Sequence, residues 1–101
     1  MSAFATITPE QLRERLDAGQ SIRMIDVREH EEVAHGMIQG AVHIPLGQIP
    51  QRLDEIPRDE EVVIICRSGY RSDQACQYLE QLGYKGATNL VGGMLAWVNQ
   101  P

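Results

Sequence analysis

The fold is decided by the stretch Glu61-Val62-Val63-Ile64-Ile65-Cys66-Arg67-Ser68-Gly69-Tyr70-Arg71-Ser72. Its four consecutive β-branched residues, 62–65, predict a strand that is buried on both faces, as strands of parallel sheets are. Apolar residues then recur at the spacing of one helix face at Ala75, Tyr78, Leu79 and Leu82, with Gly83 placed to end the helix. Cys66 therefore lies between a central strand and a helix N-terminus, where open α/β sheets usually bind ligands.

Three features of this position favour the thiolate form of Cys66. A helix N-terminus carries about half a positive charge and stabilises a nearby anion by about 0.3–1 kcal/mol. Arg67 and Arg71 add two cations, and a tight loop at Gly69 can turn several backbone N–H groups inward. Cysteines in such surroundings have pKa values of about 3.5–7.5 instead of about 8.5. Cys66 is therefore the candidate nucleophile, and the alternative of a cysteine that only fills the core is less favoured.

Four segments of the chain, taken in order, resemble the sequences of single-domain rhodaneses, which are sulfurtransferases of the thiosulfate type. The loop 66–72 is similar to the family signature Cys-Arg-x-Gly-x-Arg-Ser/Thr. The other three segments are Asp26-Val27-Arg28 with Glu29 and Glu32, Gly36-Met37-Ile38-Gln39-Gly40-Ala41 through Ile44-Pro45, and Leu90-Val91-Gly92-Gly93-Met94-Leu95-Ala96-Trp97. The sequence departs from the family pattern at Met37, where the family usually has a histidine, and His35 stands two positions earlier.

The resemblance implies one rhodanese domain over residues 1–101, folded as a three-layer α/β/α structure around a central, mostly parallel sheet of about five strands. It also implies a thiosulfate sulfurtransferase. Such an enzyme moves a sulfane sulfur from thiosulfate, or a related persulfide donor, through a Cys66 persulfide to cyanide or to a thiol, which a partner protein can carry. The expected site has Cys66 as the nucleophile and, as substrate-binding residues, Arg67, Ser68, Gly69, Tyr70 and Arg71. No metal or organic cofactor is expected.

Two other classes of function stay open beside this one. Rhodanese-like domains also serve as persulfide carriers or as regulatory binding modules, although modules of the second kind usually lack the cysteine that is present here at position 66. Phosphatases and arsenate reductases of the same fold have a loop one residue longer between cysteine and arginine. Because four residues separate Cys66 from Arg71, the smaller ring of N–H groups suits one extra sulfur atom, and sulfur transfer is favoured.

Composition and charge are those of a small globular domain. The 101 residues are 43% hydrophobic and 23% charged. A net charge of −5 predicts no general attraction to nucleic acid or to anionic membranes. No apolar run approaches the roughly 20 residues of a membrane span, and Met1-Ser2-Ala3-Phe4 lacks the basic and apolar regions of a signal peptide. A cytoplasmic monomer is therefore expected.

Outside the loop, the spacing of apolar and turn residues predicts alternating strands and helices. Strands are predicted at 4–7, 22–27, 41–44 and 84–90, and helical segments at 29–34, 46–56 and 93–98. The best-marked helix begins after Thr8, the predicted N-cap, with Pro9 as its first residue, Gln11 in a capping box and Gly19 at its end. Trp97 is expected to anchor the core. This alternation predicts a parallel sheet with helices on both faces.

Several polar residues receive structural interpretations. Asp26 and Arg28 end a strand at the same sheet edge as Cys66, and we expect them to hold loops by hydrogen bonds. Cys76 lies more than a turn into its helix, too far from Cys66 for a disulfide, and is interpreted as a core cysteine. The histidines at 30 and 35 lack the i, i+4 spacing of helical zinc sites. Solvated or loop-stabilising roles are favoured for these two and for the histidine at 43.

Overall fold

Residues 4–101, which the computed structural model describes, contain five strands that form one sheet, and every neighbouring pair is parallel. Met1 to Ala3, on which the expectation of no signal peptide partly rests, lie outside the described residues. The strands are β1 (Ala5–Ile7), β2 (Arg23–Asp26), β3 (Val42–His43), β4 (Val62–Ile65) and β5 (Ala87–Leu90), in the spatial order β1-β5-β4-β2-β3. The predicted central strand, β4, is therefore central, with β5 and β2 beside it.

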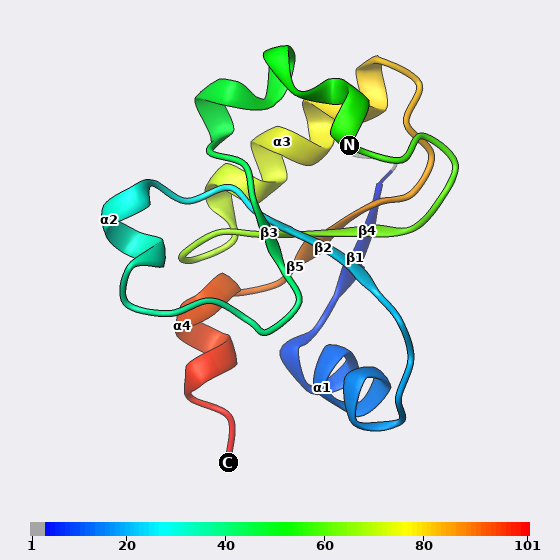
Figure 1. The fold of residues 1–101 in the computed structure, drawn as a ribbon. Coiled ribbons are helices and arrows are strands. Elements are labelled where there is room, and N and C mark those ends of the chain that lie inside the picture. The colour runs from blue at the N-terminus through cyan, green and yellow to red at the C-terminus, as the bar shows by residue number, and fades with distance from the viewer. Residues whose placement is uncertain (1–3) are drawn as a thin grey trace.

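Helices cover both faces of this sheet and give the predicted three-layer α/β/α arrangement (Figure 1). The helix α3 (Tyr70–Gln81) and two short 3₁₀ helices (Leu46–Gln51 and Leu53–Glu55) lie on one face. The helices α1 (Pro9–Asp17) and α4 (Gly93–Val98) lie on the other, and α2 (His30–Val33) follows the carboxyl end of β2. Within residues 4–101, no helix is both long and apolar enough to cross a membrane.

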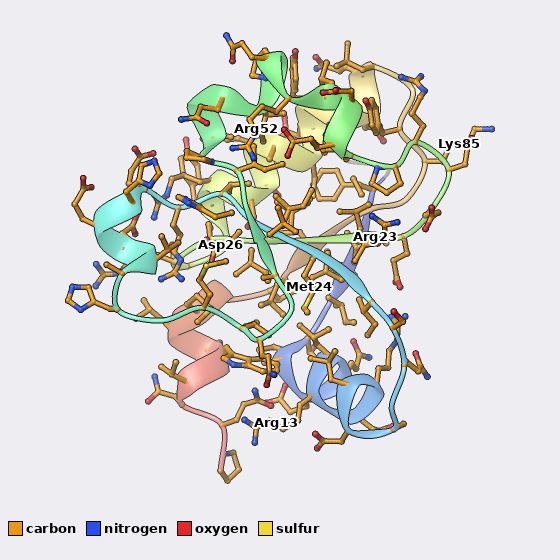
Figure 2. The ribbon with its side chains drawn as sticks, in the orientation of Figure 1. Arg13, Arg23, Met24, Asp26, Arg52 and Lys85 are labelled. Carbon is orange, nitrogen blue, oxygen red and sulfur yellow. The ribbon has the colours of Figure 1, made fainter. Side chains whose placement is uncertain are left out.

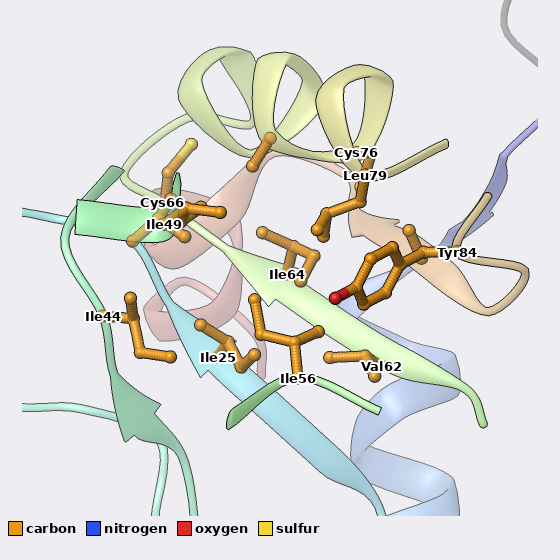
Figure 3. Packing of buried hydrophobic residues seen from close by; sticks show 13 residues of the cluster. Ile25, Ile44, Ile49, Ile56, Val62, Ile64, Cys66, Cys76, Leu79 and Tyr84 are labelled. Atoms are coloured by element: carbon orange, nitrogen blue, oxygen red, sulfur yellow. The ribbon is translucent and has the colours of Figure 1, made fainter. Parts of the chain in front are cut away.

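The central strand divides the core into two clusters of buried side chains. Val62, Ile64 and Cys66 pack toward α3 and the 3₁₀ helices (Figure 3). Val63 and Ile65 pack toward α1 and α4, because successive side chains of a strand point to opposite faces. Burying each aliphatic side chain of β4 stabilises the fold by about 1.5–3 kcal/mol. The same alternation directs the Cys66 side chain to the α3 side of the sheet.

The helix α1 begins where its sequence signal predicts. The Gln11 N–H donates to Thr8 Oγ1 (3.1 Å) and the Thr8 N–H donates to Gln11 Oε1 (3.0 Å), so the capping box is confirmed. From α1, Leu12 is buried in the second cluster, and Met24 points into it from β2 (Figure 2). Trp97 of α4 packs on this cluster and is partly buried, which confirms the predicted anchor.

Two expectations from helical spacing are wrong. Residues 46–56 form two 3₁₀ helices and not one α-helix, because Pro50 has no backbone N–H and its ring would clash with the carbonyl of the preceding α-helical turn. Leu82, predicted on the apolar face of α3, is 39% exposed. The helix ends at Gln81, so Leu82 is the C-cap next to Gly83, whose φ is +90°, and the chain turns away before Leu82 reaches the core.

The order of the strands places a switch in chain direction beside Cys66. From β2 the chain continues to the outer strand β3, whereas from β4 it continues to β5 on the other side. The connections that follow β2 and β4 therefore leave the carboxyl ends of these two strands in opposite directions. Open α/β sheets bind their ligands at such a point. Asp26 and Ile65 are partners in the register, and the Val27 N–H donates to Ile65 O (2.8 Å). The ends of both strands therefore meet at this edge.

The first residues of α4 pack directly on the backbone of the cysteine loop. The N–H groups of Met94 and Leu95 donate to Cys66 O (2.8 Å) and Arg67 O (2.9 Å). Gly93 has a φ of +57°, and a Cβ at this position would lie only 2.5 Å from Cys66 O. Glycine alone fits both the left-handed backbone and the space.

We expect Gly93→Ala to lower the free energy of unfolding by about 2 kcal/mol or more, because the side chain would add a clash to a strained backbone. Urea denaturation followed by circular dichroism measures this change. Gly47→Ala is the matched control, since φ at Gly47 is not positive and nothing lies within 4 Å of an added Cβ. Equal stability of the two variants would show that α4 moves aside without cost.

Candidate active site

Cys66 directly follows β4, which ends at Ile65, and the residue is 1% exposed, with its sulfur enclosed by the loop. Its Sγ accepts a hydrogen bond from the Gly69 N–H (3.0 Å) and lies 3.2 Å from Ser72 Oγ. Gly69 is the N-cap of α3 and has a φ of +101°, a left-handed conformation that glycine adopts without strain. The loop therefore surrounds the sulfur with hydrogen-bond donors, as expected for a tight turn at Gly69.

Hydrogen bonds are the main reason why the thiolate of Cys66 is favoured. Burial by itself raises the pKa of the thiol, because an anion loses solvation in the interior. Interactions with the Ser72 hydroxyl and with the N–H groups of Ser72, Gly69 and Ser68 together outweigh burial, so the pKa of Cys66 lies below its ordinary value. Of the expected features, the inward-turned N–H groups contribute to this shift, whereas Arg67 and Arg71 are not among its main causes.

Two polar residues outside the predicted site complete the surroundings of the sulfur. Ser72 is fully buried, and its hydroxyl donates to Asn89 Oδ1 at 2.5 Å. Asn89, 7% exposed on β5, donates from Nδ2 to Gly69 O (3.2 Å). Ser72 belongs to the loop signature, but its type alone does not mark it as a partner of the sulfur. Asn89 carries a usable signal, because an amide inside a buried parallel strand needs a buried hydrogen-bond partner.

The Arg71 guanidinium forms a bidentate ion pair with Glu32, at the carboxyl side of β2. Arg71 Nη1 and Nη2 donate to Glu32 Oε1 (2.6 Å) and Oε2 (2.7 Å). These hydrogen bonds are the main cause that raises the pKa of Arg71 and lowers the pKa of Glu32 to about 2. Arg71, predicted to bind substrate, therefore has both outer nitrogens engaged. Glu32 is a further site residue that only its family-like segment indicated.

Asp26 and Arg28 form a buried ion pair, the structural role predicted for them. Asp26 is fully buried at the end of β2 that lies toward α2 (Figure 2), and Arg28 is 7% exposed. The Asp26 carboxylate accepts hydrogen bonds from Arg28 Nε (2.9 Å) and Nη2 (2.8 Å). Arg28 Nη2 also donates to Gly36 O (2.7 Å). Each buried charge thus has a partner, as burial requires, and the pair holds the segment that carries Glu32.

The other predicted loop residues lie at the surface. Ser68 directs only its N–H toward the sulfur, and the side chains of Arg67 and Tyr70 are exposed. Arg67 borders a cavity of about 400 Å³ whose further lining includes Arg28, Gly36, Met37, Met94 and Trp97. Met94 and Trp97 belong to the α4 side of the sheet, whereas the Cys66 side chain packs on the α3 side. The cavity is therefore next to the loop but does not enclose the sulfur.

The second cysteine and the histidines lie apart from the sulfur. Cys76 is a free, fully buried thiol, and burial raises its pKa to about 12, which confirms the core interpretation. His43 Nε2 lies 2.6 Å from Arg28 O, and its ring packs edge-on against His30 with centroids 4.8 Å apart. Both histidines thus support the loops around Arg28. In the part of the chain from residue 4 onward, no three His, Cys, Asp or Glu side chains gather as a metal site requires.

Comparison with known proteins agrees with this geometry. A sequence model of the Rhodanese-like domain matches residues 8–100. A sulfurtransferase of Allochromatium vinosum is 48% identical over 91 residues, which cover 90% of this chain and 85% of the relative. The human thiosulfate:glutathione sulfurtransferase is 33% identical over 99% of this chain and 98% of its own. The crystal structure of a rhodanese-like domain protein from Staphylococcus aureus has a TM-score of 0.88 at 37% identity, covering 93% and 91% of the two chains.

Glu32→Gln should weaken the fold in a pH-dependent way. At pH 7 we expect the free energy of unfolding to fall by about 1–2 kcal/mol, discounted because the side chains of Arg71 and Glu32 are 28% and 27% exposed. A carboxylate whose pKa is lowered on folding stabilises the protein above its unfolded pKa. The difference between the proteins should therefore shrink as the pH falls from about 5 to about 2.

Urea denaturation at several pH values measures this difference. Glu31→Gln is the matched control, because Glu31 is an exposed neighbour on the same helix. A Glu32→Gln effect that does not vary with pH, or that equals the effect of the control, would show that the ion pair contributes nothing.

Proposed function

The chain belongs to the Rhodanese-like domain family, and from this premise we propose that it is a sulfurtransferase that carries sulfur on Cys66. One observation carries the proposal: the buried Sγ accepts a hydrogen bond from the Gly69 N–H (3.0 Å) at the N-terminus of α3. Such donors stabilise a thiolate, which is the nucleophilic form of cysteine. The relatives from Allochromatium and human, both named as sulfurtransferases, support the same class of reaction.

Thiosulfate is the proposed sulfur donor. The Cys66 thiolate attacks its outer sulfur, the S–S bond breaks, and sulfite leaves with the electron pair, so that Cys66 becomes a persulfide. A nucleophilic acceptor then attacks the outer sulfur of the persulfide and restores the Cys66 thiolate. Cyanide would leave as thiocyanate, and a thiol, free or on a protein, would leave as a persulfide. These are the two halves of a ping-pong reaction, and their electrons balance without a redox partner.

Different parts of the loop have different proposed roles. The N–H groups of Ser68 and Gly69 hold the thiolate and then the persulfide. Arg67, which is exposed, attracts the dianionic donor and neutralises the departing sulfite. Arg71 shapes the loop through Glu32, because both of its outer nitrogens are engaged there.

The size of the loop argues against phosphate chemistry at the same cysteine. An attacked phosphoryl group needs donors at about 2.7–3.1 Å from its oxygens, and an arginine fork is well suited to supply two of them. Here four residues separate Cys66 from Arg71, and the fork of Arg71 is occupied by Glu32. The Gly69 N–H already donates to the sulfur itself. The ring therefore suits one added sulfur atom better than a tetrahedral oxyanion.

Thiosulfate should add one sulfur atom to the protein at Cys66, and cyanide should remove it. The thiolate is the attacking group, so Cys66→Ser should show no added sulfur, whereas Cys76→Ser should keep it because Cys76 is buried in the core. Mass spectrometry under non-reducing conditions, before and after each reagent, measures the transfer.

Two outcomes of this experiment, and one of a separate activity assay, would contradict the proposal. An unchanged mass of the wild-type protein would favour a binding module. A folded Cys76→Ser variant that no longer takes up sulfur would mean that two thiols cooperate. Turnover of an aryl phosphate that matches sulfur transfer to cyanide would reverse the conclusion drawn from the loop.

Arg67→Ala should lower kcat/KM for thiosulfate by about ten- to a hundredfold at low ionic strength, because a charge-assisted contact is worth about 1.5–3 kcal/mol. Steady-state kinetics with thiosulfate and cyanide measure the change. Arg23→Ala is the matched control: Arg23 is also exposed, but it begins β2 at the opposite edge of the sheet. If the two variants have the same efficiency, Arg67 does not meet the donor.

A further inference from the structure

A closed ring of hydrogen bonds connects the sulfur of Cys66 to the amide of Asn89. Ser72 Oγ lies 3.2 Å from Cys66 Sγ and 2.5 Å from Asn89 Oδ1. Asn89 Nδ2 donates to Gly69 O (3.2 Å), and the N–H of the same Gly69 donates to the sulfur (3.0 Å). Ser72 and Asn89 are both buried, so water does not replace these partners. One amide therefore holds two of the groups that contact the sulfur.

The chemistry of the ring determines the direction of its bonds. Gly69 O can only accept, so the Asn89 side chain must present its NH₂ group to it and its carbonyl oxygen to Ser72. That carbonyl oxygen also only accepts, so Ser72 must donate its single hydroxyl proton to Asn89. The Ser72 oxygen then faces Cys66 with its lone pairs, which suits a neutral thiol that donates its S–H proton.

A thiolate reverses this preference. Without the S–H proton the sulfur needs donors, and the Ser72 hydroxyl lies 3.2 Å away. If the hydroxyl turns to the sulfur, Asn89 Oδ1 loses its donor in the interior, where an unsatisfied acceptor costs about 1–3 kcal/mol. If the hydroxyl stays on Asn89, its lone pairs face an anion. The sulfur and Asn89 therefore compete for one proton.

We propose that Asn89 is a positioning residue for the nucleophile. Its carbonyl oxygen withholds the Ser72 proton from the Cys66 thiolate, and its NH₂ group keeps the Gly69 N–H aimed at the sulfur. Because the nucleophilicity of a thiolate falls as its basicity falls, this competition keeps the thiolate more reactive than an undivided Ser72 hydroxyl would leave it. Asn89 thus acts on the group that attacks the donor in the proposed function, on which this role rests.

The charged and titratable groups around the sulfur are buried, paired or exposed to solvent. They include Arg71 with Glu32, Asp26 with Arg28, the exposed Arg67 and Tyr70, the buried thiol of Cys76, and Asp73 of α3, which accepts a hydrogen bond from Gln77. Strand β5, helix α4 and the 3₁₀ helix at 46–51 contribute no ionisable side chain. A neutral replacement of Asn89 therefore affects the sulfur through Ser72 and Gly69.

A double-mutant cycle on the pKa of the Cys66 thiol tests this role. The rate of alkylation by iodoacetamide, measured over a range of pH, reports that pKa, and Cys76 stays silent because its pKa is about 12 and it remains a thiol in that range. The four proteins are wild type, Ser72→Ala, Asn89→Leu and the double variant. We expect Ser72→Ala to raise the pKa. The cycle then compares the change that Asn89→Leu causes in the pKa of Cys66 in two proteins, one with Ser72 and one with alanine at position 72. With Ser72 present, this change should be more negative by about 0.4–2 pKa units.

Equal shifts in the two backgrounds would overturn the proposal, because a residue that only supports the fold acts alike with or without Ser72. If Asn89→Leu does not fold, Asn89→Asp decides. The carboxylate keeps the acceptor for Ser72 and removes the donor to Gly69, so the pKa should rise, and should rise more with Ser72 present. Equal rises would again overturn the proposal.

Thr88→Val is the matched control, because Thr88 is a buried polar residue of β5 that donates to Gly86 O and does not contact the loop. It should leave the pKa of Cys66 unchanged, and a shift as large as that of the Asn89 variants would also count against the proposal. Alkylation requires no sulfur transfer, so a failure of this test is distinct from a failure of the proposed function.

Discussion

A sulfur anion at the buried end of the central strand persists only if hydrogen-bond donors replace the water that it has lost. Cys66 is 1% exposed, and the Gly69 N–H of the loop donates to its sulfur, whereas the proton of the nearby Ser72 hydroxyl is donated to Asn89. Two glycines make this possible. Gly69 adopts the left-handed conformation that caps α3 above the sulfur, and Gly93 lets α4 pack against the carbonyl oxygen of Cys66. The backbone around the sulfur is thereby held from both sides.

Most of the charge near the loop holds the frame and is not free to bind a ligand. Arg71 pairs with Glu32, and Arg28 pairs with the buried Asp26. The partly exposed Arg71–Glu32 pair adds only modestly to stability, but its bidentate geometry fixes where α2 and α3 lie relative to the sulfur. The attraction of an anionic donor is then left to Arg67 in a chain of net charge −5. In the proposed reaction, the groups that donate hydrogen bonds to the sulfur are mainly neutral. They stabilise the thiolate without holding back sulfite, the anionic product.

The sequence by itself determined the elements that depend on close neighbours in the chain. The β-branched run at 62–65 predicted the buried strand, and Thr8 predicted the start of α1. The position of Cys66 between a strand and a helix follows from these local periods, and the resemblance of four ordered segments indicated the family. Helical spacing misled at Leu82, which lies beyond the end of α3. It also misled at 46–56, where Pro50 prevents a continuous α-helix, because an apolar period does not record whether each backbone N–H can donate.

Only the tertiary structure decided which residues meet the sulfur and which hold the loop. Glu32 and Arg71 are 39 residues apart in the sequence, and Ser72 and Asn89 are 17 apart, yet each pair is in hydrogen-bond contact. The order of strands in the sheet brings the ends of β2, β4 and β5 to one edge. A hydrogen bond acts over about 3 Å, so these contacts depend on how strands are placed side by side, which local spacing does not encode.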